Sequence, residues 1–517
     1  MNKETFLYKR TPSSSDFTMW MAFPGPYSFS LSSLGYLWMF KTIDEAEIVN
    51  VERVCSDTQN IHYPPKNLIG FSFSFDMDFL VIFEMLEKYG IALRSSERGE
   101  NAPLVFAGGP VVTANPLPYS KIFDFFVIGD GEDANLEAVK ICKLRLPKSE
   151  TLKKLAEVEG IYVPCHCERS EAIQPLDDSR KKLDCFVADA PRNDMKVKKR
   201  TKQLNECIYT PILSEDAYFK NTFIVEMSRG CTNRCGFCLA SYLNLPLRCT
   251  PYEELIKALE LGLKHTNKIA LLGAQISAHP NFHDVCKYIA GKNIEMSVSS
   301  LRVDAITPDV VKTLVAAGQK NVTLAIEAGS ERLRRVINKN LSEEQILKAI
   351  KICAANGLKG LKLYGMIGLP TETQEDIDAL IRLSAKIKAE NKGFNISFAF
   401  STFVPKPHTP FQWCEREDTK SLETKIAYLR KELHKLGIGA SFSSPKWDYY
   451  QWILSCGDES LGDYLIEIYR RGGKLGAFKS VLAGYKPPEL GENLPWDFID
   501  IKPGKKHLKN IYDKIKA

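Results

Sequence analysis

The chain lacks a long uninterrupted apolar segment and a large excess of charge. Its most apolar N-terminal stretch, residues 17–40, is broken by Pro24, Gly25, Pro26 and several serines. It therefore predicts neither a signal peptide nor a membrane span. The formal net charge of +6 is mild for 517 residues and does not by itself indicate a nucleic-acid partner. We expect a soluble protein of the cytoplasm.

The length makes a single compact core implausible. With 44% hydrophobic and 26% charged residues over 517 positions, the chain predicts two to four ordinary globular domains. The patterns indicate an α/β domain over 1–145, a linker over 146–216, a second α/β domain over 217–400 and a mostly helical extension over 401–517.

Cysteine is plentiful, and its distribution is informative. Fourteen cysteines suggest a reducing compartment, where clustered thiols usually serve metals or redox chemistry. Cys231, Cys235 and Cys238 have the spacing C-x3-C-x2-C and follow a predicted buried strand, Phe223–Glu226. Three thiolates on one loop can hold three irons of a [4Fe–4S] cube and leave the fourth iron open, whereas structural zinc takes four protein ligands. Cys249 is the one nearby candidate for a fourth ligand, so zinc is the alternative.

The string from Glu226 to Cys238 resembles the cluster-binding motif of the radical S-adenosylmethionine (radical SAM) superfamily. The resemblance implies that the open iron chelates the amino and carboxylate groups of S-adenosylmethionine (SAM). An electron from the cluster would then cleave the sulfonium and give a 5′-deoxyadenosyl radical. Phe237 fits the family's aromatic position beside the adenine.

Strand and helix patterns alternate after the cysteines. Strands are predicted at 269–272, 295–299, 321–326 and 360–366, with helical segments between them. This repetition resembles the partial (βα)6 barrel of radical SAM enzymes, in which function lies at the carboxyl ends of the strands.

The resemblance also implies contacts to SAM from each strand end. Gly273 and Gln275 occupy the place of a Gly-Gly-Glu motif that binds the amino group, although the match is degenerate. Ser300 and Arg302 lie where polar groups meet the carboxylate and ribose. Glu327 would accept hydrogen bonds from the ribose hydroxyls. Ile367 belongs to a motif that backs the adenine, after which Thr373 and Asp376 predict a helix cap.

The first domain predicts a parallel sheet with glycine-rich turns where strands end. Gly108, Gly109 and Gly129 lie in two such turns, in a segment that resembles the cobalamin-binding-type, Rossmann-like domain preceding many radical SAM barrels. These glycines would let the backbone approach the nucleotide tail of cobalamin. The Asp-x-His-x-x-Gly motif that supplies the cobalt ligand is absent. Cobalamin would thus bind without that histidine, or the domain is a flavodoxin-like scaffold.

Residues 165–194 show no sustained periodicity and resemble a translated palindromic repeat. Cys165 and Cys167, with Cys185, suggest a metal site in isolation. An inert surface insert is the preferred interpretation.

We expect an enzyme that cleaves SAM with a [4Fe–4S] cluster and, if cobalamin is bound, transfers a methyl group to an unactivated carbon. The alternatives are cobalamin-free modification of RNA or peptide, and a non-catalytic iron–sulfur or SAM-binding protein. The expected partners are an unidentified substrate and an electron donor such as flavodoxin or ferredoxin.

Overall fold

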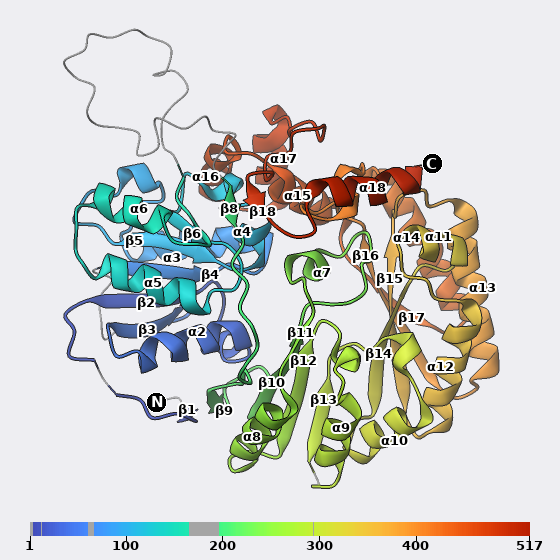
Figure 1. The fold of residues 1–517 in the computed structure, drawn as a ribbon. Coiled ribbons are helices and arrows are strands. Elements are labelled where there is room, and N and C mark those ends of the chain that lie inside the picture. The colour runs from blue at the N-terminus through green and yellow to red at the C-terminus, as the bar shows by residue number, and fades with distance from the viewer. Residues whose placement is uncertain (1–3, 12, 60–66, 165–195, 293, 517) are drawn as a thin grey trace. The chain divides into compact units, whose positions relative to one another are not determined.

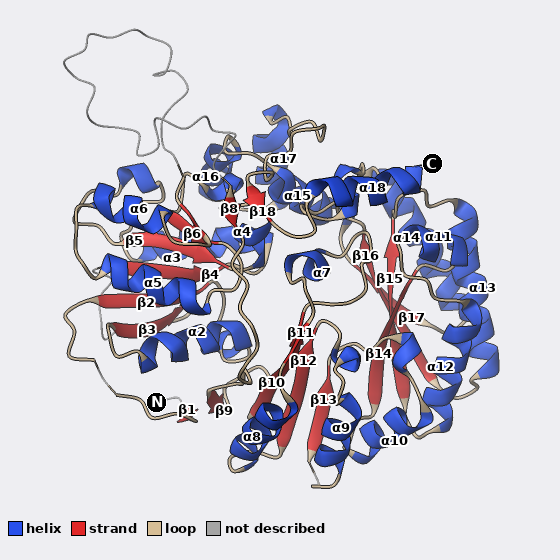
Figure 2. Ribbon diagram, in the orientation of Figure 1, coloured by secondary structure: helices blue, strands red, loops and turns tan. Residues whose placement is uncertain are grey.

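The computed structural model describes residues 4–11, 13–59, 67–164, 196–292 and 294–516. The chain divides into two compact units. The barrel unit comprises Met1–Leu7, Gln203–Ile453 and Lys502–Ala517, and the N-terminal unit comprises Tyr8–Lys202 and Leu454–Ile501. Each unit is built on parallel strands with flanking helices (Figures 1 and 2), which confirms the predicted α/β class.

The N-terminal unit contains a six-stranded sheet with the order β3-β2-β4-β5-β6-β7. All neighbouring strands are parallel except β6 and β7. In such a doubly wound sheet, ligands usually bind at the carboxyl ends of the strands. The strands are β2 (Thr18–Phe23), β3 (Asn50–Cys55), β4 (Leu68–Ser72), β5 (Leu104–Gly108), β6 (Phe125–Val127) and β7 (Ile161–Tyr162).

Helices from both parts of this unit accompany the sheet. A short parallel pair, β8 (Val197–Lys198) and β18 (Ile499–Asp500), also joins the two parts. The helices are α1 (Tyr27–Ser30), α2 (Leu34–Glu45), α3 (Phe79–Lys88), α4 (Pro110–Ala114), α5 (Glu132–Cys142), α6 (Lys148–Ala156), α16 (Leu461–Arg470) and α17 (Leu475–Val481).

The barrel unit contains two four-stranded sheets, β11-β10-β12-β13 and β14-β15-β16-β17. A parallel bridge between Leu301 and Leu324 connects them, and every pairing except β10 with β11 is parallel. The strands are β10 (Thr222–Arg229), β11 (Arg248–Cys249), β12 (Lys268–Gly273), β13 (Glu295–Val298), β14 (Asn321–Glu327), β15 (Gly360–Ile367), β16 (Asn395–Thr402) and β17 (Gly439–Phe442).

The helices of the barrel unit lie mainly along the outside of these strands (Figure 1). A small antiparallel pair, β1 (Glu4–Phe6) and β9 (Ile212–Ser214), completes the unit. The helices are α7 (Leu239–Leu243), α8 (Tyr252–Leu263), α9 (Phe282–Ala290), α10 (Pro308–Ala316), α11 (Glu331–Val336), α12 (Glu343–Ala355), α13 (Gln374–Glu390), α14 (Thr419–Lys435), α15 (Pro445–Cys456) and α18 (Lys505–Lys516).

Alternating side chains give the barrel two different faces. On β15, Leu361 and Leu363 are buried in the core beneath the helices, whereas Lys362 and Tyr364 are exposed on the other face. This period of two is what a strand imposes on its side chains. The apolar side chains of such a strand pack into the outer core, and its polar side chains lie on the inner face.

The division of the chain differs from the predicted domain boundaries. Helix α6 and strand β7 belong to the N-terminal unit, although residues 146–216 were expected to form a linker. Thr151, Leu152 and Leu155 of α6 are buried, which explains why this segment is part of a core. The predicted C-terminal extension is shared between the units. Its boundary at residue 401 falls within β16, a strand that was not predicted.

The proposed insert at 165–194 and its cysteines lie outside the described residues. Among the described helices, none has the combination of length and apolar character needed to span a bilayer.

Candidate functional site

The three predicted cluster cysteines lie on the loop that follows β10. Cys231 and Cys235 are each 8% exposed, and Cys238 is half-buried at the N-cap of α7. Burial, with smaller contributions from the thiols of Cys238 and Cys231, raises the pKa of the Cys235 thiol to about 11, against the opposing charge of Lys339. Their mutual influence places the three thiols in one electrostatic environment.

Three thiols are the ligand set that a [4Fe–4S] cube needs, one thiolate for each of three irons. Among the described residues, no group of three or more His, Cys, Asp or Glu side chains, these cysteines included, is arranged to hold a metal ion. The eleven described cysteines are all free thiols, so the three of the loop are chemically available for such a cube.

Close backbone contacts fix the shape of the cysteine loop. Gly230 has a φ of +95°, and a Cβ there would lie 2.4 Å from the carbonyl oxygen of Asn244. A Cβ on Gly236 would lie 2.5 Å from the ring of Phe411. The amide of Phe411 donates to the Gly236 carbonyl at 3.1 Å. Both glycines are thus required for the loop to pack.

Gln275 is directly connected to this loop. Its side-chain oxygen accepts hydrogen bonds from the Thr232 amide at 3.1 Å, the Thr232 hydroxyl at 2.9 Å and the Cys231 thiol at 3.0 Å. The residue is only 9% exposed. The degenerate motif therefore brings Gln275 to the predicted site, where it orients the cysteine loop.

Gly273 and Ser228 provide a test of whether the site fits SAM. Ser228 is 1% exposed, and its hydroxyl has no hydrogen-bond partner among the described residues. A Cβ on Gly273 would lie 2.8 Å from that hydroxyl, so only glycine leaves it unobstructed. A buried polar atom without a partner is costly. A polar ligand such as SAM would satisfy it.

Glu327 ends β14 in a strained conformation. Its φ is +62°, and the strand register shifts between Ala325 and Glu327. Its carboxylate accepts a hydrogen bond from the Lys339 ammonium at 2.8 Å, within a buried ion pair. The predicted ribose acceptor is thus at the site, with a lysine as its partner.

Arg302 adds positive charge near the thiols. It is half-buried and forms a bidentate pair with Asp304, at 2.8 and 2.6 Å. Burial acts against its charge, but Asp304 and then the thiols of Cys235 and Cys231 raise the pKa of Arg302 overall. Its neighbour Ser300 is exposed.

The two predicted adenine contacts differ in their surroundings. Phe237 is half-buried on the cysteine loop. Ile367 is fully buried in the outer core, so its side chain is not presented to a ligand. The predicted cap of the next helix is confirmed, because Asp376 accepts hydrogen bonds from the Thr373 amide and hydroxyl.

Lys339 and Phe411 are site residues that the sequence analysis did not identify. Neither lies in a recognisable pattern, and each reaches the cysteine loop through the fold alone.

Two glycines of the N-terminal unit allow close approach of other parts of its own backbone. Gly109 has a φ of +121°, and a Cβ there would lie 2.5 Å from the Phe73 carbonyl oxygen. Gly129 has a φ of +101°, and a Cβ would lie 2.2 Å from the Arg200 carbonyl oxygen. Gly108 has ordinary space, since its nearest contact is 3.6 Å away. Two of the three predicted cobalamin contacts are therefore explained by chain packing.

The same sheet edge is linked to the C-terminal part of this unit. The side-chain amide of Asn115 donates to the carbonyls of Ser455 and Gly457, at 3.1 and 2.8 Å. The Ser455 hydroxyl donates to Asp76 at 2.9 Å. These groups, like Gly109 and Gly129, give no evidence of a site for a cofactor tail.

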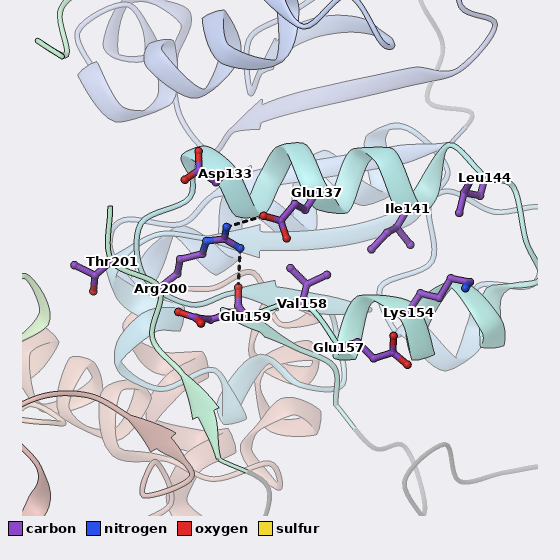
Figure 3. Close-up of a pocket in the computed structure, with 10 residues that line it drawn as sticks. All are labelled: Asp133, Glu137, Ile141, Leu144, Lys154, Glu157, Val158, Glu159, Arg200 and Thr201. Atoms are coloured by element: carbon purple, nitrogen blue, oxygen red, sulfur yellow. Dashed lines mark hydrogen bonds and ion pairs between the residues drawn. The ribbon is translucent and has the colours of Figure 1, made fainter. Parts of the chain in front are cut away.

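A surface hollow of about 760 Å³ in this unit is lined mostly by charged side chains (Figure 3). Arg200 pairs with Glu137 at 2.6 Å and donates to the Glu159 carbonyl at 3.2 Å. The hydrogen bond with Glu137 raises the pKa of Arg200, and burial opposes it. None of the lining residues is a cysteine or histidine.

Comparisons with known proteins agree with both units. A family model described as "Radical SAM proteins, N-terminal" matches residues 40–164, and one described as "Radical SAM superfamily" matches residues 225–384. The solved structure of OxsB, described as a cobalamin-dependent S-adenosylmethionine radical enzyme with aqua-cobalamin and S-adenosylmethionine bound, shares the fold. Its TM-score is 0.51 and its identity 14%, over 97% of this chain and 79% of that one.

Two relatives are similar in sequence. "Uncharacterized methyltransferase PH0819" of Pyrococcus horikoshii is 26% identical over 60% of this chain and 64% of its own length, which is just under two thirds. "Uncharacterized protein MJ0966" of Methanocaldococcus jannaschii is 34% identical over 374 residues, 71% of this chain and 74% of that protein. The N-terminal and superfamily matches, which lie in the two units in the expected order, show that the chain belongs to the radical SAM superfamily.

Proposed function

We propose that the protein is a radical SAM enzyme whose [4Fe–4S] cluster is held by Cys231, Cys235 and Cys238. The observation that carries this proposal is that three thiols share one loop at the end of a barrel strand. Polar groups from neighbouring strand ends surround the same loop.

The residues around the thiols can each do defined work. The cysteines hold three irons, and Gln275 keeps their loop in place through Thr232. When bound, the cluster and SAM supply the electron transfer that yields a 5′-deoxyadenosyl radical. Arg302 favours negative charge beside the thiols. The Ser228 hydroxyl is free to bond a polar group of SAM.

Iron and sulfide analysis tests the cluster. Anaerobic reconstitution should give about four irons and four sulfides per chain, as the cube requires. Addition of SAM should then change the electron paramagnetic resonance (EPR) spectrum of the reduced protein, because one iron is open to it. One zinc per chain with no retained iron would contradict the proposal.

Methyl transfer is the second candidate, supported by the name of the Pyrococcus relative and by the fold shared with a cobalamin-dependent enzyme. Cobalamin would have to bind without a histidine from the missing motif. A base-off absorbance spectrum after anaerobic reconstitution would support it. Failure to retain any corrinoid would count against it.

The cytoplasm is the proposed location, since fourteen cysteines suit a reducing compartment. The proposed electron source is a small carrier such as flavodoxin or ferredoxin. Reduction of the reconstituted protein by such a carrier, followed by its absorbance, would test this partner.

A further inference from the structure

The ion pair of Glu327 and Lys339 is buried next to the cysteine loop. Its two charged atoms are 2.8 Å apart, and the side chains are 10% and 9% exposed. Burying two charges is costly, and an apolar pair of similar size is often at least as stable. A buried pair at this position therefore calls for an explanation other than stability.

Left-handed backbone occurs at Glu327 and on both sides of Lys339. Glu327 has a φ of +62°, and the residues on either side of Lys339, Asn338 and Asn340, have φ values of +56° and +38°. Left-handed conformations are uncommon for residues other than glycine, and they concentrate at functional sites. The strain marks both segments as positions where geometry is held against local preference.

A fully buried arginine holds these two segments together. Arg334 donates through Nη1 to the carbonyls of Ala328 and Gly329, at 2.9 and 2.8 Å. Its Nε donates to the carbonyl of Leu341 at 2.7 Å, and its own carbonyl accepts from the amide of Lys339 at 2.8 Å. The segments after β14 and after α11 are thereby fixed to each other.

The segment that carries Lys339 is also fixed to the cysteine loop. The amide of Gly236 donates to the carbonyl of Ile337 at 3.0 Å. The side-chain amide of Asn338 donates to the carbonyl of Arg234 at 2.8 Å. These two bonds tie the backbone on the N-terminal side of Lys339 to the residues on either side of Cys235, a predicted cluster ligand.

We infer that the buried Glu327–Lys339 pair sets the reduction potential of the cluster held by the cysteine loop, with Lys339 favouring the reduced state and Glu327 opposing it. One-electron reduction adds negative charge to the cluster. A fixed cation nearby stabilises that charge and a fixed carboxylate destabilises it, most strongly where water is excluded. The inference rests on the proposed function, because it requires the cluster.

A redox titration of the reconstituted protein, followed by the EPR signal of the reduced cluster, tests the inference. Lys339→Met should lower the midpoint potential and Glu327→Gln should raise it. We expect each change to alter the reduction equilibrium about tenfold, which is about 59 mV for one electron. The double variant should lie between them, and Lys339→Arg should stay near the wild type because it keeps the charge.

Lys425→Met is the matched control. Lys425 also forms a largely buried ion pair in the barrel unit, with Glu372 at 2.8 Å, and its other ionic partner is Glu417 at 2.7 Å rather than a residue of the cysteine loop. Its loss should leave the potential unchanged even if the protein becomes less stable.

Opposite shifts for the two single variants would support the inference, since a merely structural role would move both in one direction. Equal potentials, or shifts of the same sign, would overturn it. If Lys339→Met retains no cluster, Glu327→Gln decides, and a potential at or below the wild-type value overturns the inference. A wild-type protein that forms no cluster would instead contradict the proposed function.

Discussion

The two units present the same kind of sheet edge and use it differently. At the carboxyl ends of the barrel strands lie three thiols, a strained Glu327 and a Ser228 hydroxyl that has no hydrogen-bond partner in the described part of the chain. At the corresponding edge of the N-terminal sheet, the backbone of Phe73 and Arg200 occupies the space where side chains at Gly109 and Gly129 would lie. The first edge keeps polar groups available to a ligand, and the second satisfies its groups within the chain.

A glycine after a buried strand therefore has two explanations. It can allow a ligand to approach, or it can allow another part of the same chain to approach. Thiols clustered in a reducing compartment have fewer alternative explanations. Chemical side chains therefore identify a site more reliably than glycines do.

Removal of one cluster ligand should have the largest effect. Cys235→Ala should reduce retained iron and SAM cleavage to background, because an iron of the cube loses its protein ligand. Iron analysis after anaerobic reconstitution measures this. Cys249→Ala is the control: Cys249 is half-buried on β11 and should be dispensable. Equal metal loss in both variants would favour a four-cysteine zinc site and break the comparison.

A replacement of Gly129 tests how this glycine packs at the edge of the N-terminal sheet. Gly129→Ala should reduce the free energy of unfolding by about 2–4 kcal/mol, since it adds a clash to an unfavourable φ. Gly108→Ala should change it by less than about 1 kcal/mol. The unfolding transition measured by calorimetry compares them. Equal stability of the two variants would show that Arg200 does not fill the Gly129 position.

A smaller effect, on the pH dependence of stability, should show whether water is excluded from the Asp78 carboxyl group at that edge. Burial raises the pKa of Asp78, which follows β4, to about 6, despite hydrogen bonds from the Phe75 and Ser74 amides. An unfolded aspartate titrates near 3.9. Protonated Asp78 therefore makes its full contribution to the stability of the fold below about pH 3.9, and this contribution is lost as the pH rises through about 6.

Asp78→Asn should therefore be more stable than the wild type at pH 7 to 8, with the difference vanishing toward pH 4. Asp463 provides a control of opposite sign. Burial opposes the effect, but Lys121 and Arg94 lower the pKa of Asp463, so Asp463→Asn should lose stability at neutral pH. Thermal melts from pH 4 to 8 measure both. A pH-independent difference for Asp78→Asn would show that its carboxylate is hydrated.

Much of the barrel could be predicted from sequence because its signals are local. The alternation of strands and helices, the cysteine spacing and the Thr373 cap all involve residues close together in the chain. Strand β16 was missed although Ile396, Phe398 and Phe400 alternate with small or polar residues. This alternation is typical of a strand, although prolines follow it closely in the chain.

The ion pair and the filled glycines could not be predicted in the same way. Glu327 meets Lys339 only because Arg334 ties two segments together, and Gly129 meets Arg200 across a long connection. Neither pairing leaves a spacing or composition pattern. Such contacts depend on the tertiary fold, which also explains why Ile367 faces the core although its motif suggested a ligand contact.

Formation of 5′-deoxyadenosine tests the central claim most directly. The anaerobically reconstituted wild-type protein is mixed with SAM and a strong one-electron reductant, and the nucleoside products are separated by chromatography. The wild type should yield 5′-deoxyadenosine, and Cys238→Ala should yield none. A wild-type protein with a complete cluster and bound SAM that releases no 5′-deoxyadenosine would instead be a non-catalytic binding protein.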